Sequence, residues 1–163
     1  MVNLFTGVES AELFGGEVPA SVQHLIDAAR GAPRAEAGAA LWTAVLTAPQ
    51  CLPPYYLLYK FHASQGELDQ AHEVARKALA VAARQASIDL DWRSVQPGDA
   101  DFMTTGPARF WLFTLKALAF ISVRRGERAI ALELVNKLRT IDTGDRIGFG
   151  VVEALLAQSR SQK

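Results

Sequence analysis

Apolar residues recur at helical spacing along most of the chain, and glycine or proline interrupts them at intervals. In residues 20–30 one stripe holds four apolar side chains: Val22, Leu25, Ile26 and Ala29. Gly31 and Pro33 follow, and both are typical stop signals after an amphipathic helix. The same pattern predicts further helices at 35–48, 53–64, 68–86, 107–123, 127–141 and 145–158. No segment shows the alternation of a strand, so the chain is predicted to be all-α.

Two stretches lack this periodicity and define the expected domain organisation. Residues 1–19 contain three glycines and two Leu-Phe pairs, so we expect a flexible N-terminal arm. Residues 87–106 form a polar, irregular insertion between helices. The helices within residues 20–160 are expected to form one domain, because a chain of 163 residues is long enough for a single core. At the end of the chain, Asp145 is expected to cap the last helix.

The helices repeat in pairs. Three small or apolar residues, Ala37, Leu41 and Ala44, recur 34 residues later, and the later set is Ala71, Ala75 and Ala78. The string GELDQA at 66–71 recurs in outline as GERAIA at 126–131, with an offset of 60 residues because the insertion intervenes. Small side chains on a second helix allow the first helix to approach closely, and large residues on the first helix fill the groove.

A 34-residue helix–turn–helix period resembles the tetratricopeptide repeat. The likeness covers residues 20–86, with a degenerate copy at 108–141. It implies a tetratricopeptide-like stack of antiparallel helical hairpins, a short α-solenoid with an insertion between repeats. The sequence departs from the family pattern at Tyr59, Ala83 and Leu138.

Three strings carry a closer resemblance, to small tetratricopeptide-like proteins of the nitrogenase-associated factor T type, which are encoded near nitrogen-fixation genes. The strings are PPYYLLYKFHASQGELDQAHEVARKALAVAARQ, then DW, then GPARFWLFTLKALAFISVRRG, within residues 50–140. The resemblance implies binding to the molybdenum–iron protein of nitrogenase, during maturation or when its cofactor region is disordered.

The tetratricopeptide resemblance also implies where a partner binds, because the first helices of each pair line the concave surface of such a stack. The matching positions are Tyr56, Lys60, Ser64, Phe113, Lys116, Phe120 and Arg124. Aromatic rings beside cations suit an acidic helix or extended segment. Alternatively, the C-terminal helix or the N-terminal arm fills this surface. Secondary contacts are expected at Phe5, Phe14 and Trp92, although an indole in a polar insertion also packs back to fix the loop.

Composition narrows the partner and the compartment. Seventeen basic and seventeen acidic residues cancel, so neither nucleic acid nor a membrane surface is an expected partner. No apolar run reaches the ~20 residues that span a bilayer. Residues 1–16 lack the basic region of a secretory signal. The single cysteine, Cys51, excludes an intramolecular disulfide and fits a reducing cytoplasm.

Candidate catalytic and metal-binding chemistry is sparse. His24, His62 and His72 form no i,i+4 zinc pair, and Asp89, Asp91, Asp99 and Asp101 lack the spacing of a calcium loop. We therefore expect no cofactor and a non-catalytic adaptor or chaperone-like factor. Two alternatives stay open: a secretion-type chaperone that binds an export partner, and a small ligand-binding or thiol enzyme that uses the insertion and Cys51.

Overall fold

The computed structural model describes residues 18–104 and 106–161. Seven α-helices and one 3-10 turn make up this part of the chain. They are α2 (Ala20–Gly31), α3 (Arg34–Thr47), α4 (Leu52–Ser64), α5 (Leu68–Ala86), η1 (Trp92–Ser94), α6 (Pro107–Arg124), α7 (Arg128–Ile141) and α8 (Gly150–Ser161). No strand occurs among the described residues, so the all-α prediction is confirmed there. The expected arm at 1–19 falls almost wholly outside them, and so do Phe5 and Phe14.

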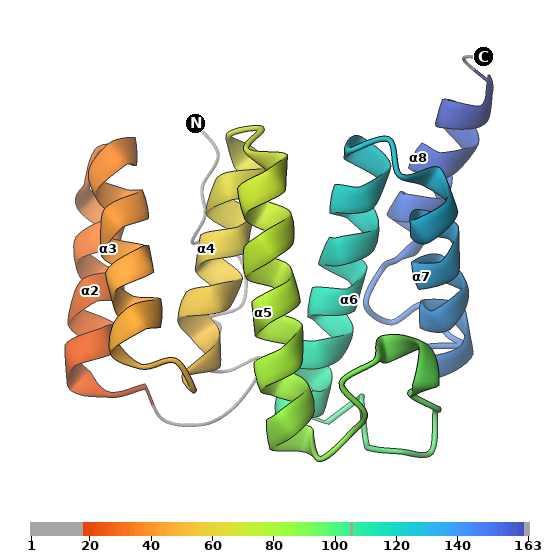
Figure 1. Cartoon of the computed structure of the whole chain (residues 1–163), viewed down its shortest axis with the longest axis horizontal. Helices are drawn as coiled ribbons and strands as arrows, with labels where there is room; N and C mark the ends of the chain where they lie inside the picture. Colours follow the sequence, from red (N-terminus) through yellow and green to blue (C-terminus); the bar gives the residue numbers. More distant parts are fainter. Residues whose placement is uncertain (1–17, 105, 162–163) are drawn as a thin grey trace.

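The helices stand in a row in chain order, from α2 and α3 at one end to α7 and α8 at the other (Figure 1). Each of them packs against the next helix along the chain, from α2 to α8. Two contacts skip a helix: α4 packs on α6, and α8 packs on α6 as well as on α7. If α4–α5 and α6–α7 are taken as pairs, the first helix of one pair contacts the first helix of the next, so α4 and α6 lie side by side.

The turns between α4 and α5 and between α6 and α7 have the same geometry. Gly66 and Gly126 take left-handed φ angles of +76° and +80°. The next amide in each turn donates back to the helix: Glu67 N to the His62 carbonyl at 3.0 Å, and Glu127 N to the Ser122 carbonyl at 2.9 Å. Such backward bonds satisfy carbonyls at a helix end. The 60-residue offset predicted from the sequence is thus present in the backbone.

The shared geometry of these turns gives a testable prediction. Gly126→Ala is expected to destabilise the fold by about 1–2 kcal/mol, because a Cβ disfavours left-handed φ. Thermal unfolding should show a fall in Tm of roughly 2–8 °C. Gly98→Ala is the matched control, since Gly98 has no left-handed φ and no atom within 4 Å of an added Cβ. Equal Tm values for the two variants would contradict the prediction.

Small side chains line the contacts between paired helices, as the repeat predicts. Ala71, Ala75 and Ala78 of α5 and Ala131 of α7 are fully buried. Tyr59 is buried too, although the tetratricopeptide pattern has a small residue there. Its Oη lies 3.3 Å from Thr114 Oγ1 of α6, and burial raises the pKa of this phenol. The buried Tyr59 hydroxyl is tolerated because it has a hydrogen-bond partner in the Thr114 hydroxyl of α6.

The insertion is tied to the helices by its apolar residues. Val95 and Phe102 are buried, and the Phe102 ring centroid lies 5.4 Å from that of Trp111 in α6. Lys137 of α7 donates to the Val95 carbonyl at 2.7 Å. The four aspartates that were considered as a calcium loop each accept a backbone amide hydrogen within the insertion: Asp89, Asp91, Asp99 and Asp101. Their carboxylates therefore stabilise the loop locally.

Asp145 caps the last helix, but the helix begins later than the sequence predicts. The expected start is residue 145, whereas α8 begins at Gly150. Residues 142–149 form a loop instead, because buried Asp142 accepts the amides of Arg146 and Ile147, both at 2.9 Å. The Asp145 carboxylate accepts the amides of Phe149 and Gly150, which orients the first turn of α8.

Candidate functional site

Helices α4 and α6 contain no aspartate or glutamate. Apart from His62, their ionisable basic side chains are Lys60, Arg109, Lys116 and Arg124. All four of these cations stand four residues from an aromatic residue on the same helix, so each shares a helix side with a ring. We call this surface the α4–α6 face, and define it by Tyr56, Lys60, Arg109, Phe113, Phe120 and Arg124.

Each cation of the α4–α6 face lies over a ring on its own helix. Lys60 Nζ is 4.8 Å from the Tyr56 ring centroid and donates to the Tyr56 hydroxyl at 3.2 Å. Arg109 lies 5.2 Å from the Phe113 centroid, and Arg124 lies 5.8 Å from that of Phe120. Such contacts contribute about 0.5–1 kcal/mol at exposed positions. The result is a surface of half-buried rings with positive charge held beside them.

The two helices are also joined across this face. Arg124 Nη1 of α6 donates to the Ala63 carbonyl of α4 at 3.3 Å. Lys116 of α6 has a lowered pKa, mainly through burial; the Asp145 carboxylate opposes this shift, and the charge of Lys60 adds to it. The carboxylate that offsets the positive charge of Lys60 at this position is therefore already present in the chain, in Asp145.

Lys116 itself is half-buried and bonded within the chain. Its Nζ donates to the Ile147 carbonyl at 2.7 Å, in the loop before α8. Ile147 and Phe149 of that loop are buried. The loop before α8 therefore contacts α6 at Lys116. Lys60, Arg109 and Arg124 remain as the cations of the α4–α6 face.

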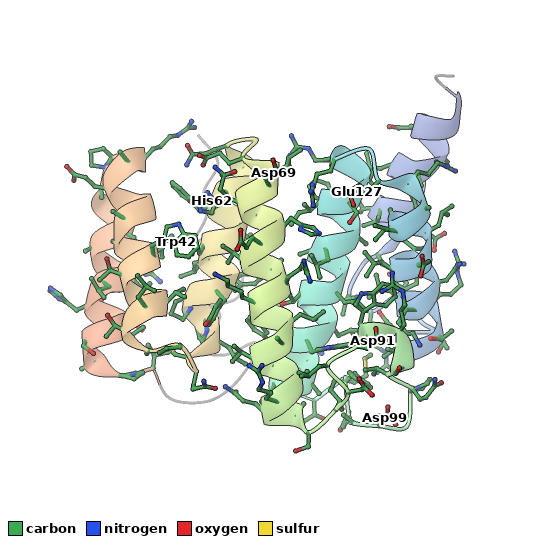
Figure 2. All side chains as sticks on the ribbon, viewed as in Figure 1. Trp42, His62, Asp69, Asp91, Asp99 and Glu127 are labelled. Atoms are coloured by element: carbon green, nitrogen blue, oxygen red, sulfur yellow. The ribbon has the colours of Figure 1, made fainter. Side chains whose placement is uncertain are left out.

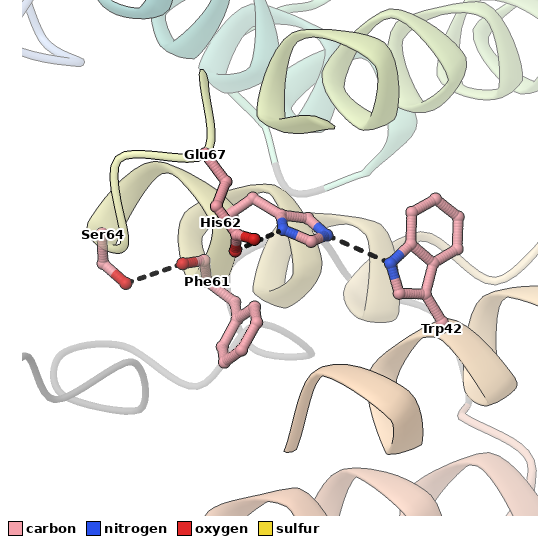
Figure 3. A network of polar contacts seen from close by, with 5 residues as sticks. All are labelled: Trp42, Phe61, His62, Ser64 and Glu67. Carbon is pink, nitrogen blue, oxygen red and sulfur yellow. Dashed lines mark hydrogen bonds and ion pairs between the residues drawn. The ribbon is translucent and has the colours of Figure 1, made fainter. Parts of the chain in front are cut away.

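Seven of the site residues predicted from the sequence lie on α4 and α6, which contact each other. Ser64 is exposed at the end of α4, where its hydroxyl donates to the Phe61 carbonyl at 2.7 Å (Figure 3). Trp92 is half-buried and packs against the core from the insertion, away from the α4–α6 face. Arg109 was missed by the sequence analysis, although its position four residues before Phe113 is the spacing of an intrahelical pair.

No protein-family model, curated protein or solved structure matches the chain. The resemblances to tetratricopeptide repeats and to nitrogenase-associated proteins therefore stay predictions. Among the described residues, no helix has the length and apolar character needed to cross a membrane. The case for a function rests on the residues of the α4–α6 face.

A second polar cluster connects α3 to the α4–α5 turn (Figure 3). Trp42 Nε1 donates to His62 Nε2 at 3.1 Å, and His62 Nδ1 lies 3.1 Å from Glu67 Oε1. Because an indole N–H is a donor only, His62 Nε2 must accept, which leaves the proton on Nδ1 to donate to Glu67. All three side chains are satisfied by one another, so this cluster positions helices.

Cys51 is the N-cap residue of α4 and is half-buried, and burial raises the pKa of its thiol. Reactive cysteines have a lowered pKa, because a nearby positive group or a helix N-terminus stabilises their thiolate. At Cys51 burial therefore opposes the effect of the α4 N-terminus. The described residues also hold no group of three or more His, Cys, Asp or Glu side chains placed to bind a metal.

Proposed function

We propose that the chain is a non-catalytic protein-binding module with a tetratricopeptide-like helical stack, and that its α4–α6 face binds an acidic segment of a partner protein. The observation that carries this proposal is the charge distribution. Helices α4 and α6 hold four Lys and Arg residues and no carboxylate, within a chain of zero formal net charge. The single cysteine fits a cytoplasmic location for such a module.

The physical chemistry of the face defines the segment it suits. Lys60 and Arg124 offer charge-assisted hydrogen bonds to carboxylates, which are shorter and stronger than neutral ones. Tyr56, Phe113 and Phe120 offer half-buried rings for apolar or aromatic side chains. The partner segment therefore carries at least two acidic residues flanking an apolar one. Electrostatic complementarity of this kind mainly sets specificity and association rate.

A peptide selection tests this proposal and does not require the partner to be identified first. A random peptide library displayed against the full chain is expected to yield sequences with net negative charge and at least one apolar or aromatic residue. Their affinity should fall steeply with salt, because exposed charges are screened within about 10 Å at 0.1 M ionic strength. Enriched sequences without an acidic excess, or no enrichment, would contradict the proposal.

The partner we propose, from the sequence resemblance, is the molybdenum–iron protein of nitrogenase. Tagged chain isolated from nitrogen-fixing cells is expected to bring down nitrogenase subunits, and purified molybdenum–iron protein should then bind the chain directly. A variant with both Lys60 and Arg124 reversed to glutamate is the control. It should neither bring down nitrogenase subunits nor bind the purified molybdenum–iron protein. Recovery of unrelated proteins alone would rule out this partner, while leaving the acidic-segment proposal to the peptide selection.

A further inference from the structure

A cavity of about 410 Å³ lies between α5 and α7. We call it the α5–α7 cavity. Its polar and aromatic walls come from α5, the insertion, α6 and the α6–α7 turn, through His72, Arg76, Trp92, Arg93, Ser122 and Glu127. Figure 2 shows Glu127 at the α6–α7 turn and Asp91, another wall residue, in the insertion below it. The volume falls within the ~300–1,000 Å³ of small-ligand pockets.

The helical repeat explains why this cavity exists. An offset of 34 residues relates α3 to α5, and an offset of 60 relates α4 and its turn to α6 and its turn. Trp42, His62 and Glu67 therefore correspond to three wall residues of the cavity, namely Arg76, Ser122 and Glu127. In the interface between α3 and α4, which we call the first interface, the Trp42 indole and the His62 imidazole occupy the space between the helices. In the equivalent interface between α5 and α6, Ser122 replaces the imidazole and the exposed Arg76 replaces the indole, so the corresponding space is open.

One buried polar atom at the cavity has no hydrogen-bond partner: Ser122 is 1% exposed, and its Oγ is unpaired. Glu127 Oε1 is buried and forms an ion pair with Arg125 Nη1 at 3.0 Å. In the first interface the corresponding carboxylate, Glu67, accepts the ring N–H of His62. Glu127 is thus an acceptor in the position where the repeat places a heteroaromatic donor.

The remaining walls suit a flat ring. Arg93 lies 4.4 Å from the Trp92 ring centroid and forms an ion pair with Glu133 at 2.9 Å, which fixes the indole at one side of the cavity. Leu79, Leu118 and Leu134 supply apolar surface. His72 has a pKa lowered by burial and then by the charge of Arg125. The cavity therefore combines apolar and aromatic walls with a small number of converging polar groups, as ligand sites commonly do.

We propose that the α5–α7 cavity binds a planar nitrogen heteroaromatic ring that donates an N–H to Glu127 and contacts Ser122, in the place that the chain's own imidazole and indole take in the first interface. The ring belongs either to a free small molecule or to a histidine or tryptophan side chain of a bound protein. This site lies between the second helices of the pairs, and its function is separate from that of the α4–α6 face.

The test is a titration of the full, ¹⁵N-labelled chain with indole and with imidazole, followed by NMR. At least one ring is expected to shift the Trp92 indole N–H and the Ser122 amide resonances saturably. At an alkaline pH, where both imidazoles are neutral, the matching N-methylated compound, 1-methylindole or 1-methylimidazole, should bind at least about tenfold more weakly, since it then lacks the ring N–H donor. Absence of saturable shifts with both rings, or equal affinity of the methylated compound, would overturn the proposal.

Two variants test the geometry. Ser122→His is expected to abolish ring binding, because the introduced imidazole fills the cavity beside Glu127. Glu127→Gln keeps the size of the side chain and is expected to weaken ring binding at least about tenfold. Glu73→Gln, on the exposed side of α5, is the control and should bind like the unaltered chain. Equal affinity of the Glu127→Gln and Glu73→Gln variants would contradict the proposal even if Ser122→His does not fold.

A third comparison separates the two sources of the ring. N-acetyl-tryptophanamide and N-acetyl-histidinamide present the same rings on a peptide backbone. Binding of these compounds at least as tight as that of the free rings assigns the site to a partner's side chain. Binding of the free rings alone assigns it to a small molecule.

Discussion

Reversal of two charges on the α4–α6 face, by Lys60→Glu with Arg124→Glu, is expected to lower the affinity for a selected acidic peptide by roughly 100-fold. Each reversal replaces an attraction with a repulsion, and about 1.4 kcal/mol per site corresponds to tenfold. Both side chains lie over rings on their own helices, so the change alters the charge of the surface while its aromatic residues stay. Isothermal titration calorimetry at low salt measures the effect.

The fold is expected to tolerate this double change. Lys60 lowers the pKa of Lys116, so its replacement by glutamate removes a repulsion, and the bond lost from Arg124 to the Ala63 carbonyl is exposed to water. Arg34→Glu with Arg84→Glu is the matched control, because it makes the same change in net charge at exposed positions of α3 and α5. The control should bind the peptide within about threefold of the unaltered chain. Equal losses in both variants would show that net charge, and not the α4–α6 face, determines binding.

Asp142→Ala is expected to destabilise the fold by about 3 kcal/mol, the largest single-residue effect of those considered. Asp142 is buried, and its carboxylate accepts two backbone amides of the loop before α8. Hydrogen bonds to charged groups contribute ~1.5–3 kcal/mol each, and the substitution leaves both amides without a partner. Thermal unfolding should show a fall in Tm of roughly 6–12 °C.

Asp99→Ala is the control for this prediction. Asp99 also accepts a backbone amide, from Gln96, but it is exposed in the insertion, where water replaces the carboxylate. Its loss should cost less than about 1 kcal/mol. The Asp142 variant should still bind the acidic peptide, because Lys60 and Arg124 do not depend on the loop. A Tm unchanged by Asp142→Ala would contradict the structural role of this carboxylate.

The helices could be predicted from the sequence because their signals are local. Apolar spacing located α5 at both ends, and Gly66 and Gly126 identified the turns that share one geometry. The 60-residue offset was readable as well, since GELDQA and GERAIA occupy equivalent turns. In each case the residues that determine the structure lie within a few positions of the feature they form.

Several of the missed features depend on contacts between distant segments. Asp142 orders the loop at 142–149 through amides four and five residues away, but the loop also takes a bond to the Ile147 carbonyl from Lys116, 31 residues distant. The α5–α7 cavity follows from comparing one helix interface with the next, and a cavity leaves no local sequence pattern. The candidate face was predicted in outline from a family resemblance. Its pairing of cations with rings required the side chains to be placed.

The most direct test of the protein-binding proposal maps the bound peptide on the chain. Amide and side-chain NMR shifts of the full chain should be recorded with and without a selected acidic peptide. The proposal predicts that the largest changes occur at Lys60, Phe113, Phe120 and Arg124, with little change on the exposed sides of α5 and α7. Changes confined to α5, α7 or the insertion would contradict binding at the α4–α6 face.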